Sequence, residues 1–436
     1  MRERCTAGIN RVVVLGANGT MGYGSAALFT RACVRVTFLA RTLEKAREGL
    51  AAAIAQVRSP TVAERAEIGT YDADLERVVP AADLIFEALT ERLDVKRAMF
   101  ERVDALRRDD AIVATVTSGL SIDALAEGRS ESFRRRFLGL HFFNPPNVIV
   151  GTELIAGRDT EPAVMDRIEE FARSDLGRAV VRTSDTAGFA GNRVGFKVLN
   201  EVVQLAEEHG PLLMDRLVGP YTGRALPPLA TVDLVGWDIH EAIVDNLWHQ
   251  TEDEARHTFR LPEYVRRLLA KGVRGVKSGG GFFRKDEDRK LVLRPGHGDY
   301  VPVSEVSLPD LSFIDRIAAR HRIGDYRGAM RELALAEGPW AALARKVVAG
   351  YVSYAFHRAG EVTDSIEGID RIMGLGFNWA PPSVLVDTIG PEATARMMEE
   401  AGVPVPRAID EARRTRVPVR FHERRELAPG RYFVAA

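Results

Sequence analysis

The sequence contains little cysteine, no excess of charge of either sign and no long hydrophobic run. Its two cysteines, Cys5 and Cys33, cannot build a disulfide framework or a four-cysteine zinc site. Lys and Arg number 60 against 61 Asp and Glu, which disfavours nucleic-acid binding as the main function. No apolar stretch has the length of a membrane span, and no secretory apolar segment follows Met1. We therefore expect a cytoplasmic protein without a nucleic-acid or membrane partner.

Strand-like and helix-like patterns alternate over the first part of the chain. Short apolar, β-branched runs predict strands at 11–15, 34–39, 84–86, 111–115 and 137–141. Helical patterns lie between them, for example at 42–56 and 92–106. Such alternation favours a parallel sheet that is covered by helices on both faces. We expect this unit to occupy residues 1–184.

Helical patterns dominate after Thr186, and one stretch of sequence occurs twice. Asp215, which precedes a Gly/Pro-rich loop, corresponds to Asp370, 155 residues later. Asp233 corresponds to Asp387, 154 residues later. This agreement predicts a duplicated helical unit. The predicted fold is therefore α/β, with an N-terminal Rossmann-like, doubly wound sheet followed by two duplicated all-α domains. We expect these domains at 185–290 and 291–436, with a linker near 285–303.

A glycine-rich turn lies between the first predicted strand and the helix after it. In this position the backbone N–H groups at the helix N-terminus bind a pyrophosphate. Gly16 permits the tight turn, Gly19 lets phosphates approach, and Gly22 allows the helix to pack on the strand. The spacing is one residue longer than the usual dinucleotide fingerprint. The turn predicts these cofactor-binding residues: Gly16, Asn18, Gly19, Thr20, Met21 and Gly22.

The acidic residue that usually follows the second strand and binds the ribose hydroxyls is missing. Its place is taken by Ala40, with Arg41 next. Ala40 has no charge to repel a 2′-phosphate, and Arg41 offers a guanidinium group that is suited to phosphate. We therefore expect NAD or NADP as the cofactor, with NADP slightly favoured and Arg41 as a cofactor-binding residue.

Four polar residues are candidates for catalysis. His141 ends a predicted strand at the edge where open α/β sheets bind ligands. Glu153 lies twelve residues later on a short return segment, and a pair with His141 would raise the basicity of the imidazole. Ser118 follows another strand end, and Asn192 opens the first long helix of the next domain. Each of the four alone also fits a structural role, and no His/Asp cluster indicates a metal site.

Taken together, these motifs resemble the ordered motif set of the L-3-hydroxyacyl-CoA dehydrogenases. The resemblance extends over about residues 10 to 285, and the second helical unit looks like the duplicated C-terminal part of the larger members of that family. In those members the dehydrogenase is fused to a hydratase, and we expect only the oxidoreductase part here. The matching motifs are Glu87 to Arg92, Asp94 to Arg97, Thr117-Ser118, His141 to Pro145, Glu153, Gly188-Phe189, Asn192-Arg193 and Lys277 to Phe282.

The resemblance implies a role for each candidate residue. His141 would be the general base in hydride transfer between (S)-3-hydroxyacyl-CoA and 3-oxoacyl-CoA, as in the β-oxidation of fatty acids, and Glu153 would orient it. Ser118 and Asn192 would hydrogen-bond the substrate oxygen or the base. The positions that would hold the nicotinamide end of the cofactor are Glu91, Lys96 and Asn144.

Two further departures from the family pattern leave alternatives open. Val116 replaces the Asn that usually precedes Thr-Ser, and the helical hairpin that helps to hold coenzyme A in relatives is short here, at about 51–67. A dehydrogenase of a free or carrier-bound hydroxy acid is therefore one alternative, and a non-catalytic dinucleotide-binding scaffold is another. The chain is expected to form a homodimer or a pseudo-symmetric monomer.

Overall fold

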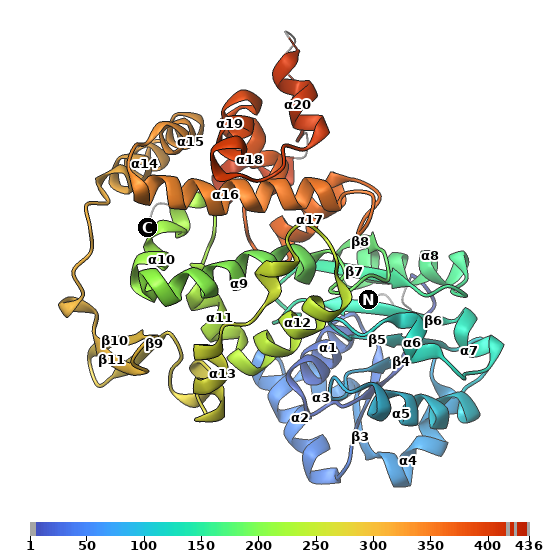
Figure 1. The fold of residues 1–436 in the computed structure, drawn as a ribbon. Coiled ribbons are helices and arrows are strands. Elements are labelled where there is room, and N and C mark those ends of the chain that lie inside the picture. Colours follow the sequence, from blue (N-terminus) through green and yellow to red (C-terminus); the bar gives the residue numbers. More distant parts are fainter. Residues whose placement is uncertain (1–5, 416–418, 423–424, 434–436) are drawn as a thin grey trace. The chain divides into compact units, whose positions relative to one another are not determined.

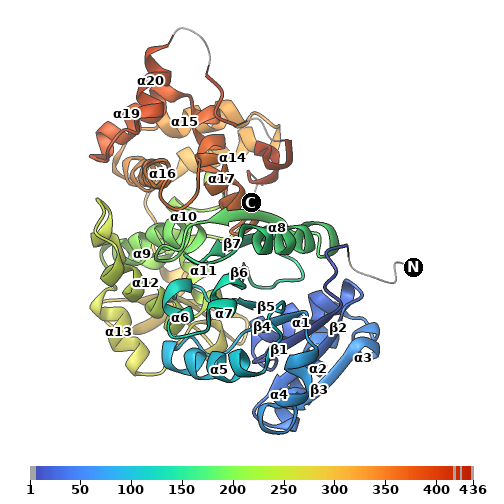
Figure 2. The same cartoon turned by 90° about the vertical axis from the view of Figure 1, so that its right-hand side faces the viewer.

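The computed structural model describes residues 6–415, 419–422 and 425–433 and contains two compact units (Figures 1 and 2). The boundary between them falls between Ala190 and Gly191. The first unit carries the large sheet, and the second is mainly helical. None of the described helices is long and apolar enough to cross a membrane.

The first unit is built on an eight-stranded sheet with the order β3-β2-β1-β4-β5-β6-β7-β8. The strands from β3 to β6 run parallel, whereas β7 pairs antiparallel with β6 and β8 runs parallel to β7. The strands are β1 (Arg11–Leu15), β2 (Arg35–Ala40), β3 (Ala66–Thr70), β4 (Leu84–Glu87), β5 (Ile112–Thr115), β6 (Phe137–Phe142), β7 (Gly151–Ala156) and β8 (Ala179–Thr183).

Helices cover both faces of this sheet. Val12 and Val14 of β1 face one hydrophobic core while Val13 and Leu15 face the other, because side chains alternate along a strand. The first core includes residues of α1 (Thr20–Arg31), α2 (Leu43–Val57), α3 (Thr61–Arg65) and α8 (Pro162–Glu170). The second includes residues of α4 (Tyr71–Val78), α5 (Leu93–Leu106), α6 (Ile122–Ala126) and α7 (Glu131–Arg135).

The predicted strands of this unit are confirmed to within one residue at each end. Three strands were not predicted. β3 is a partly exposed edge strand, and β7 and β8 continue the sheet beyond the parallel part. The segment 51–67 contains the end of α2, the short α3 and the start of β3, so no long helical hairpin follows the second strand.

The second unit contains a small sheet where the sequence suggested a linker. Residues 285–303 belong largely to a three-stranded antiparallel sheet, β9 (Phe283–Asp286), β10 (Arg289–Arg294) and β11 (Asp299–Pro302). Leu291, Val292 and Leu293 of β10 are buried, so the strand is anchored by apolar side chains between charged ends.

Helices make up most of the remainder of the second unit. Those before the small sheet are α9 (Gly191–His209), α10 (Pro211–Leu217), α11 (Pro228–Val235), α12 (Trp237–Gln250) and α13 (Glu263–Ala270). Those after it are α14 (Ser312–Arg322), α15 (Tyr326–Leu335), α16 (Pro339–Arg358), α17 (Ile366–Leu375), α18 (Pro382–Ile389), α19 (Pro391–Ala401) and α20 (Arg407–Arg414).

A buried carboxylate makes the same contact in both halves of this unit. Asp215 accepts a hydrogen bond from the backbone N–H of Leu229 at 2.8 Å, in the first turn of α11. Asp370 accepts one from the backbone N–H of Ser383 at 3.0 Å, in the first turn of α18. Burial raises the pKa of each carboxyl group to about 7. Corresponding residues of a duplicated helical unit are expected to make the same contact, as these two aspartates do.

The second repeated aspartate ties a distant segment to each copy. Asp233 accepts hydrogen bonds from the backbone N–H groups of Phe282 and Phe283, at 2.8 and 2.9 Å. Asp387 accepts two in the same way, both at 2.9 Å, from residues 421 and 422. The correspondence between the copies therefore reaches the segment after α20.

Candidate active site

The glycine-rich turn that connects β1 to α1 is tightly packed against neighbouring backbone. Gly16 has a φ of +81°, and a Cβ atom there would lie 2.3 Å from the carbonyl oxygen of Ala88. A Cβ atom on Gly22 would lie 2.1 Å from the carbonyl oxygen of Gly16. At Gly19 neither the φ of −78° nor the packing demands glycine, since a Cβ atom would lie at an ordinary contact distance of 3.5 Å from the carbonyl oxygen of Gly16. A side chain at Gly19 would instead occupy the solvent-exposed side of the turn, where a ligand could approach the backbone.

The N-terminus of α1 is open to an anion. The helix begins at Thr20 with no side-chain cap and no acidic residue in its first turn. The N–H groups of Thr20, Met21 and Gly22 have no acceptor within the helix because of their position. Together with the partial positive charge of the helix end, they fit a pyrophosphate. Asn18, the extra residue of the turn, is exposed beside them.

The end of β2 carries no acidic side chain. Ala40 is its last residue and is fully buried, and Arg41 follows with an exposed side chain. Within the described part of the chain, no hydrogen-bond or ion-pair partner is found for the Arg41 guanidinium group. Arg41 is therefore the nearest cation in sequence to the end of this strand, and its donors are available to a ligand.

His141 and Glu153 form a buried pair. They are register partners on the antiparallel strands β6 and β7, so their side chains lie on the same face of the sheet. Nδ1 of His141 lies 2.7 Å from Oε2 of Glu153, and Oε1 of Glu153 accepts a hydrogen bond from the backbone N–H of Ala190 at 2.9 Å. The network assigns the Nδ1 proton to the bond with Glu153, which leaves Nε2 of His141 as the acceptor.

A second buried network joins β4 to α5 and contains a residue whose role the sequence did not predict. Nζ of Lys96 lies 2.7 Å from Oε1 of the fully buried Glu87 and 3.2 Å from Oε2 of Glu91. Burial alone would lower the pKa of Lys96, but the charges of Glu87 and Glu91 outweigh it and raise the pKa. Glu87 therefore keeps the predicted cofactor residue Lys96 charged. In the sequence it was only the first residue of a motif that resembles the family, directly after a predicted strand.

Glu91 links this network to the segment that carries Ser118. Oε1 of Glu91 accepts hydrogen bonds from Oγ1 of Thr117 at 2.6 Å and from the backbone N–H of Ser118 at 2.8 Å. Ser118 follows β5, and His141 lies near the end of the neighbouring parallel strand β6. The structure thus brings Glu91, Lys96 and Ser118 into one network at the same edge of the sheet as the His141–Glu153 pair.

The two remaining predicted residues, Asn144 and Asn192, belong to different units. Asn144 is exposed and stands two residues after β6, next to a cis peptide bond to Pro145. Asn192 is the second residue of α9 in the second unit and is buried. Within the described residues, no group of three or more His, Cys, Asp or Glu side chains is placed to hold a metal ion.

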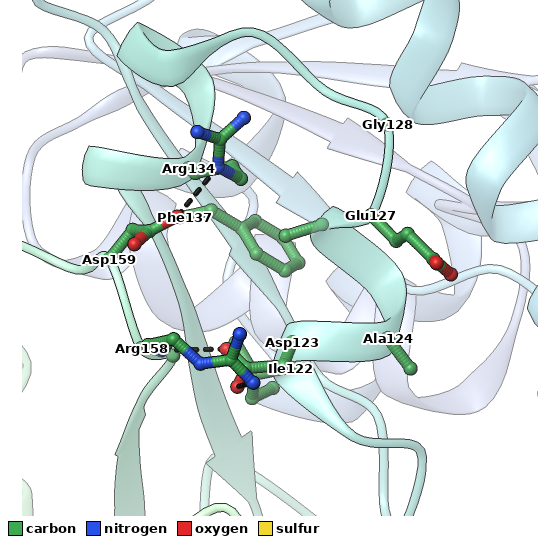
Figure 3. Close-up of a pocket in the computed structure, with 11 residues that line it drawn as sticks. Ile122, Asp123, Ala124, Glu127, Gly128, Arg134, Phe137, Arg158 and Asp159 are labelled. Atoms are coloured by element: carbon green, nitrogen blue, oxygen red, sulfur yellow. Dashed lines mark hydrogen bonds and ion pairs between the residues drawn. The ribbon is translucent and has the colours of Figure 1, made fainter.

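A surface pocket of about 470 Å³ lies at the opposite end of β6, where Phe137 begins the strand (Figure 3). Its charged side chains already have partners. Arg134 pairs with Asp159 at 2.6 Å, and Arg158 lies 3.4 Å from Asp123. None of the predicted site residues lines this pocket, so it is not the candidate active site.

Comparison with known proteins identifies the family. Residues 11–186 match the model of the 3-hydroxyacyl-CoA dehydrogenase NAD binding domain, and residues 188–285 match that of the C-terminal domain of the same enzymes. The chain belongs to the 3-hydroxyacyl-CoA dehydrogenase family. Its first unit is thus a domain for a nicotinamide dinucleotide, in agreement with the geometry of the glycine-rich turn.

Individual relatives agree with this assignment. A probable 3-hydroxyacyl-CoA dehydrogenase of Deinococcus radiodurans is 34% identical over 66% of this chain and 86% of its own length. A protein of Bacillus subtilis with the same name is 30% identical over 92% of this chain, which spans only 54% of that relative. The crystal structure of a 3-hydroxybutyryl-CoA dehydrogenase from Escherichia coli has the same fold. It gives a TM-score of 0.67 at 21% identity, over 90% of this chain and 94% of that one.

Proposed function

We propose that this protein is an NAD(P)-dependent oxidoreductase that interconverts (S)-3-hydroxyacyl-CoA and 3-oxoacyl-CoA. The observation that carries the proposal is the His141–Glu153 pair, with Nδ1 and Oε2 2.7 Å apart on neighbouring strands. A family fold alone would not require this pair, because folds are shared by proteins with different functions. A buried imidazole with one nitrogen engaged by a carboxylate is suited to proton transfer through the other.

The proposed proton transfer follows from these contacts. Nε2 of His141 takes the proton of the 3-hydroxyl group as its O–H bond breaks and the carbonyl bond forms at C3. Glu153 stabilises the imidazolium that results, while its bond to the N–H of Ala190 keeps the carboxylate in place. A bound nicotinamide cofactor would supply the acceptor for the hydride from C3 in this direction and the hydride donor in the reverse direction. Ser118 and Asn192 are proposed to hydrogen-bond the substrate oxygen.

The cofactor site is proposed to accept a 2′-phosphate. Ala40 offers no carboxylate to repel it, and the exposed Arg41 side chain has free donors at the end of β2. Glu91, Lys96 and Asn144 are proposed to hold the nicotinamide end. We infer that NADP is used at least as well as NAD.

A substrate panel tests both parts of this proposal. We expect reduction of 3-oxoacyl-CoA thioesters with either reduced cofactor, with a kcat/KM for NADPH at least equal to that for NADH. Initial rates should be measured with 3-oxoacyl thioesters of coenzyme A, the same acyl groups on pantetheine, and the free 3-oxo acids. Faster turnover of a free acid or a pantetheine thioester would overturn the assignment of coenzyme A, and a tenfold preference for NADH would overturn the cofactor assignment.

The second helical copy is proposed to make this chain a pseudo-symmetric monomer. Arg224 and Trp379 pair with each other in an isolated antiparallel bridge, although they stand at equivalent positions of the two copies, 155 residues apart. Self-pairing of equivalent residues is the mark of a two-fold interface between identical subunits. Here the duplicated copy supplies the second half of that interface. Light scattering should give the mass of one chain, and a concentration-independent mass of two chains would contradict the proposal.

A further inference from the structure

Tyr71 lies next to the end of β2, where the carboxylate that usually binds the ribose is absent. Ala40 and Thr70, the last residues of β2 and β3, are register partners on parallel strands. Arg41 and Tyr71 directly follow them, so the two residues leave neighbouring strands at the same edge of the sheet. Tyr71 then opens α4, whose N-terminus is capped by the Thr70 side chain. Its backbone position is therefore fixed by both a strand and a helix cap.

The hydroxyl group of Tyr71 reaches the glycine-rich turn. It accepts a hydrogen bond from the backbone N–H of Gly16 at 2.9 Å, and the tyrosine side chain is largely buried. A phenolic hydroxyl that accepts one bond still has its own proton to donate. No acceptor for that proton is found among the described residues. The O–H group of Tyr71 is therefore a hydrogen-bond donor beside the turn that none of the described residues uses.

The surroundings of this hydroxyl group keep its proton in place. Burial raises the pKa of Tyr71, against the opposing effects of the Gly16 N–H and the positive charge of Arg41. The hydroxyl therefore stays protonated near neutral pH. Arg41 leaves the neighbouring strand at the same edge of the sheet, where its positive charge would attract a phosphate.

We propose that Tyr71 is a specificity-determining residue for the cofactor: its hydroxyl donates a hydrogen bond to the oxygen on C2′ of the adenosine ribose. Arg41 adds an ionic contact when that oxygen carries a phosphate. The pair replaces a carboxylate, which would accept from a 2′-hydroxyl group and repel a 2′-phosphate. This inference rests on the proposed function only in that the first unit binds a nicotinamide dinucleotide.

Titration with adenosine fragments tests the inference without turnover. Dissociation constants for ADP, 2′-deoxy-ADP and adenosine 2′,5′-bisphosphate should be measured by calorimetry for the wild type and for Tyr71→Phe. We expect the variant to bind ADP about fivefold and the bisphosphate tenfold or more weakly, because a hydrogen bond to a charged group is the stronger one. Its affinity for 2′-deoxy-ADP should stay within twofold of the wild-type value.

Two further variants separate a ligand contact from damage to the turn. Arg41→Gln, at an exposed site, should weaken the bisphosphate at least tenfold and leave both diphosphates unchanged. Tyr300→Phe, a matched change in the second unit, should alter none of the three. Equal weakening of all three ligands by Tyr71→Phe would show that Tyr71 only supports the turn, and a wild type that binds none would also overturn the inference. Absence of acyl-CoA turnover would instead count against the proposed substrate and leave the titrations unaffected.

Discussion

Replacement of His141 by alanine is expected to lower kcat by about 10²- to 10⁴-fold, the range for loss of a positioned acid or base. The variant removes Nε2, the acceptor that the bond between Nδ1 and Glu153 leaves available. Affinity for the reduced cofactor should change less than twofold, because the proposed pyrophosphate site is the turn between β1 and α1. Steady-state rates and a separate fluorescence titration of the cofactor would measure the two effects. Activity within threefold of the wild type would remove His141 from the mechanism.

Glu153→Gln is the matched control for this experiment. Glutamine keeps the shape of the side chain, but it removes the negative charge beside the imidazole and leaves an acceptor oxygen for only one of the two hydrogen bonds. We expect a smaller loss of kcat than with His141→Ala. Steady-state rates would measure this loss, and a kcat equal to that of the wild type would mean that Glu153 only fills space.

Replacement of Lys96 by methionine is expected to destabilise the protein by about 3–5 kcal/mol, the usual result of leaving a buried charge without its partner. Glu87 is fully buried, and two of its contacts, at 2.7 and 2.9 Å, come from Nζ of Lys96. Chemical denaturation, followed by circular dichroism, would measure the change in the free energy of unfolding.

A double variant makes this prediction specific. Glu87→Gln combined with Lys96→Met removes both charges, so most of the lost stability should return. Lys45→Met, which breaks an exposed pair with Glu48, should leave the denaturation midpoint unchanged. If Lys96→Met and the double variant were equally unstable, the loss would reflect packing around Lys96 rather than the uncompensated charge of Glu87.

The parts of the site that follow from local sequence were predictable. The glycine-rich turn is a single run of residues between a strand and a helix, and its conformation is set by its own glycines. His141 and Glu153 could be paired in advance because residues after neighbouring strand ends meet at the edge of a sheet. The structure contains that contact, between register partners on the antiparallel strands β6 and β7.

The parts that depend on contacts between distant segments were not predictable. The contacts of Glu87 and Tyr71 cannot be seen in the sequence, because only the sheet order places Glu87 next to Lys96 and Tyr71 against Gly16. The segment at 285–303 has the Gly, Pro and charged residues of a linker. Its short apolar centre nevertheless buries Leu291 to Leu293 when β10 pairs with β9 and β11. Pairing with distant residues decided the structure in each case.

The helical duplication lies between these extremes. Short motifs 154 and 155 residues apart predicted it, and the repeated hydrogen bonds of Asp215 and Asp370 give it a physical basis. The sequence did not indicate how the two copies contact each other. Arg193 of α9 forms a buried ion pair with Asp253 at 2.7 Å and a hydrogen bond to Tyr354 of α16. No sequence motif predicted this link between α9 and α16.

The most direct test of the account is to identify the product that the wild-type protein makes from acetoacetyl-CoA. The protein should be mixed with acetoacetyl-CoA and either NADPH or NADH while the absorbance of the reduced nicotinamide is followed, and the product should then be resolved by chiral chromatography. The account predicts oxidation of one cofactor for each thioester reduced, with (S)-3-hydroxybutyryl-CoA as the product. Saturable binding of the reduced cofactor without any consumption of it, with this or any other acyl-CoA, would contradict the account.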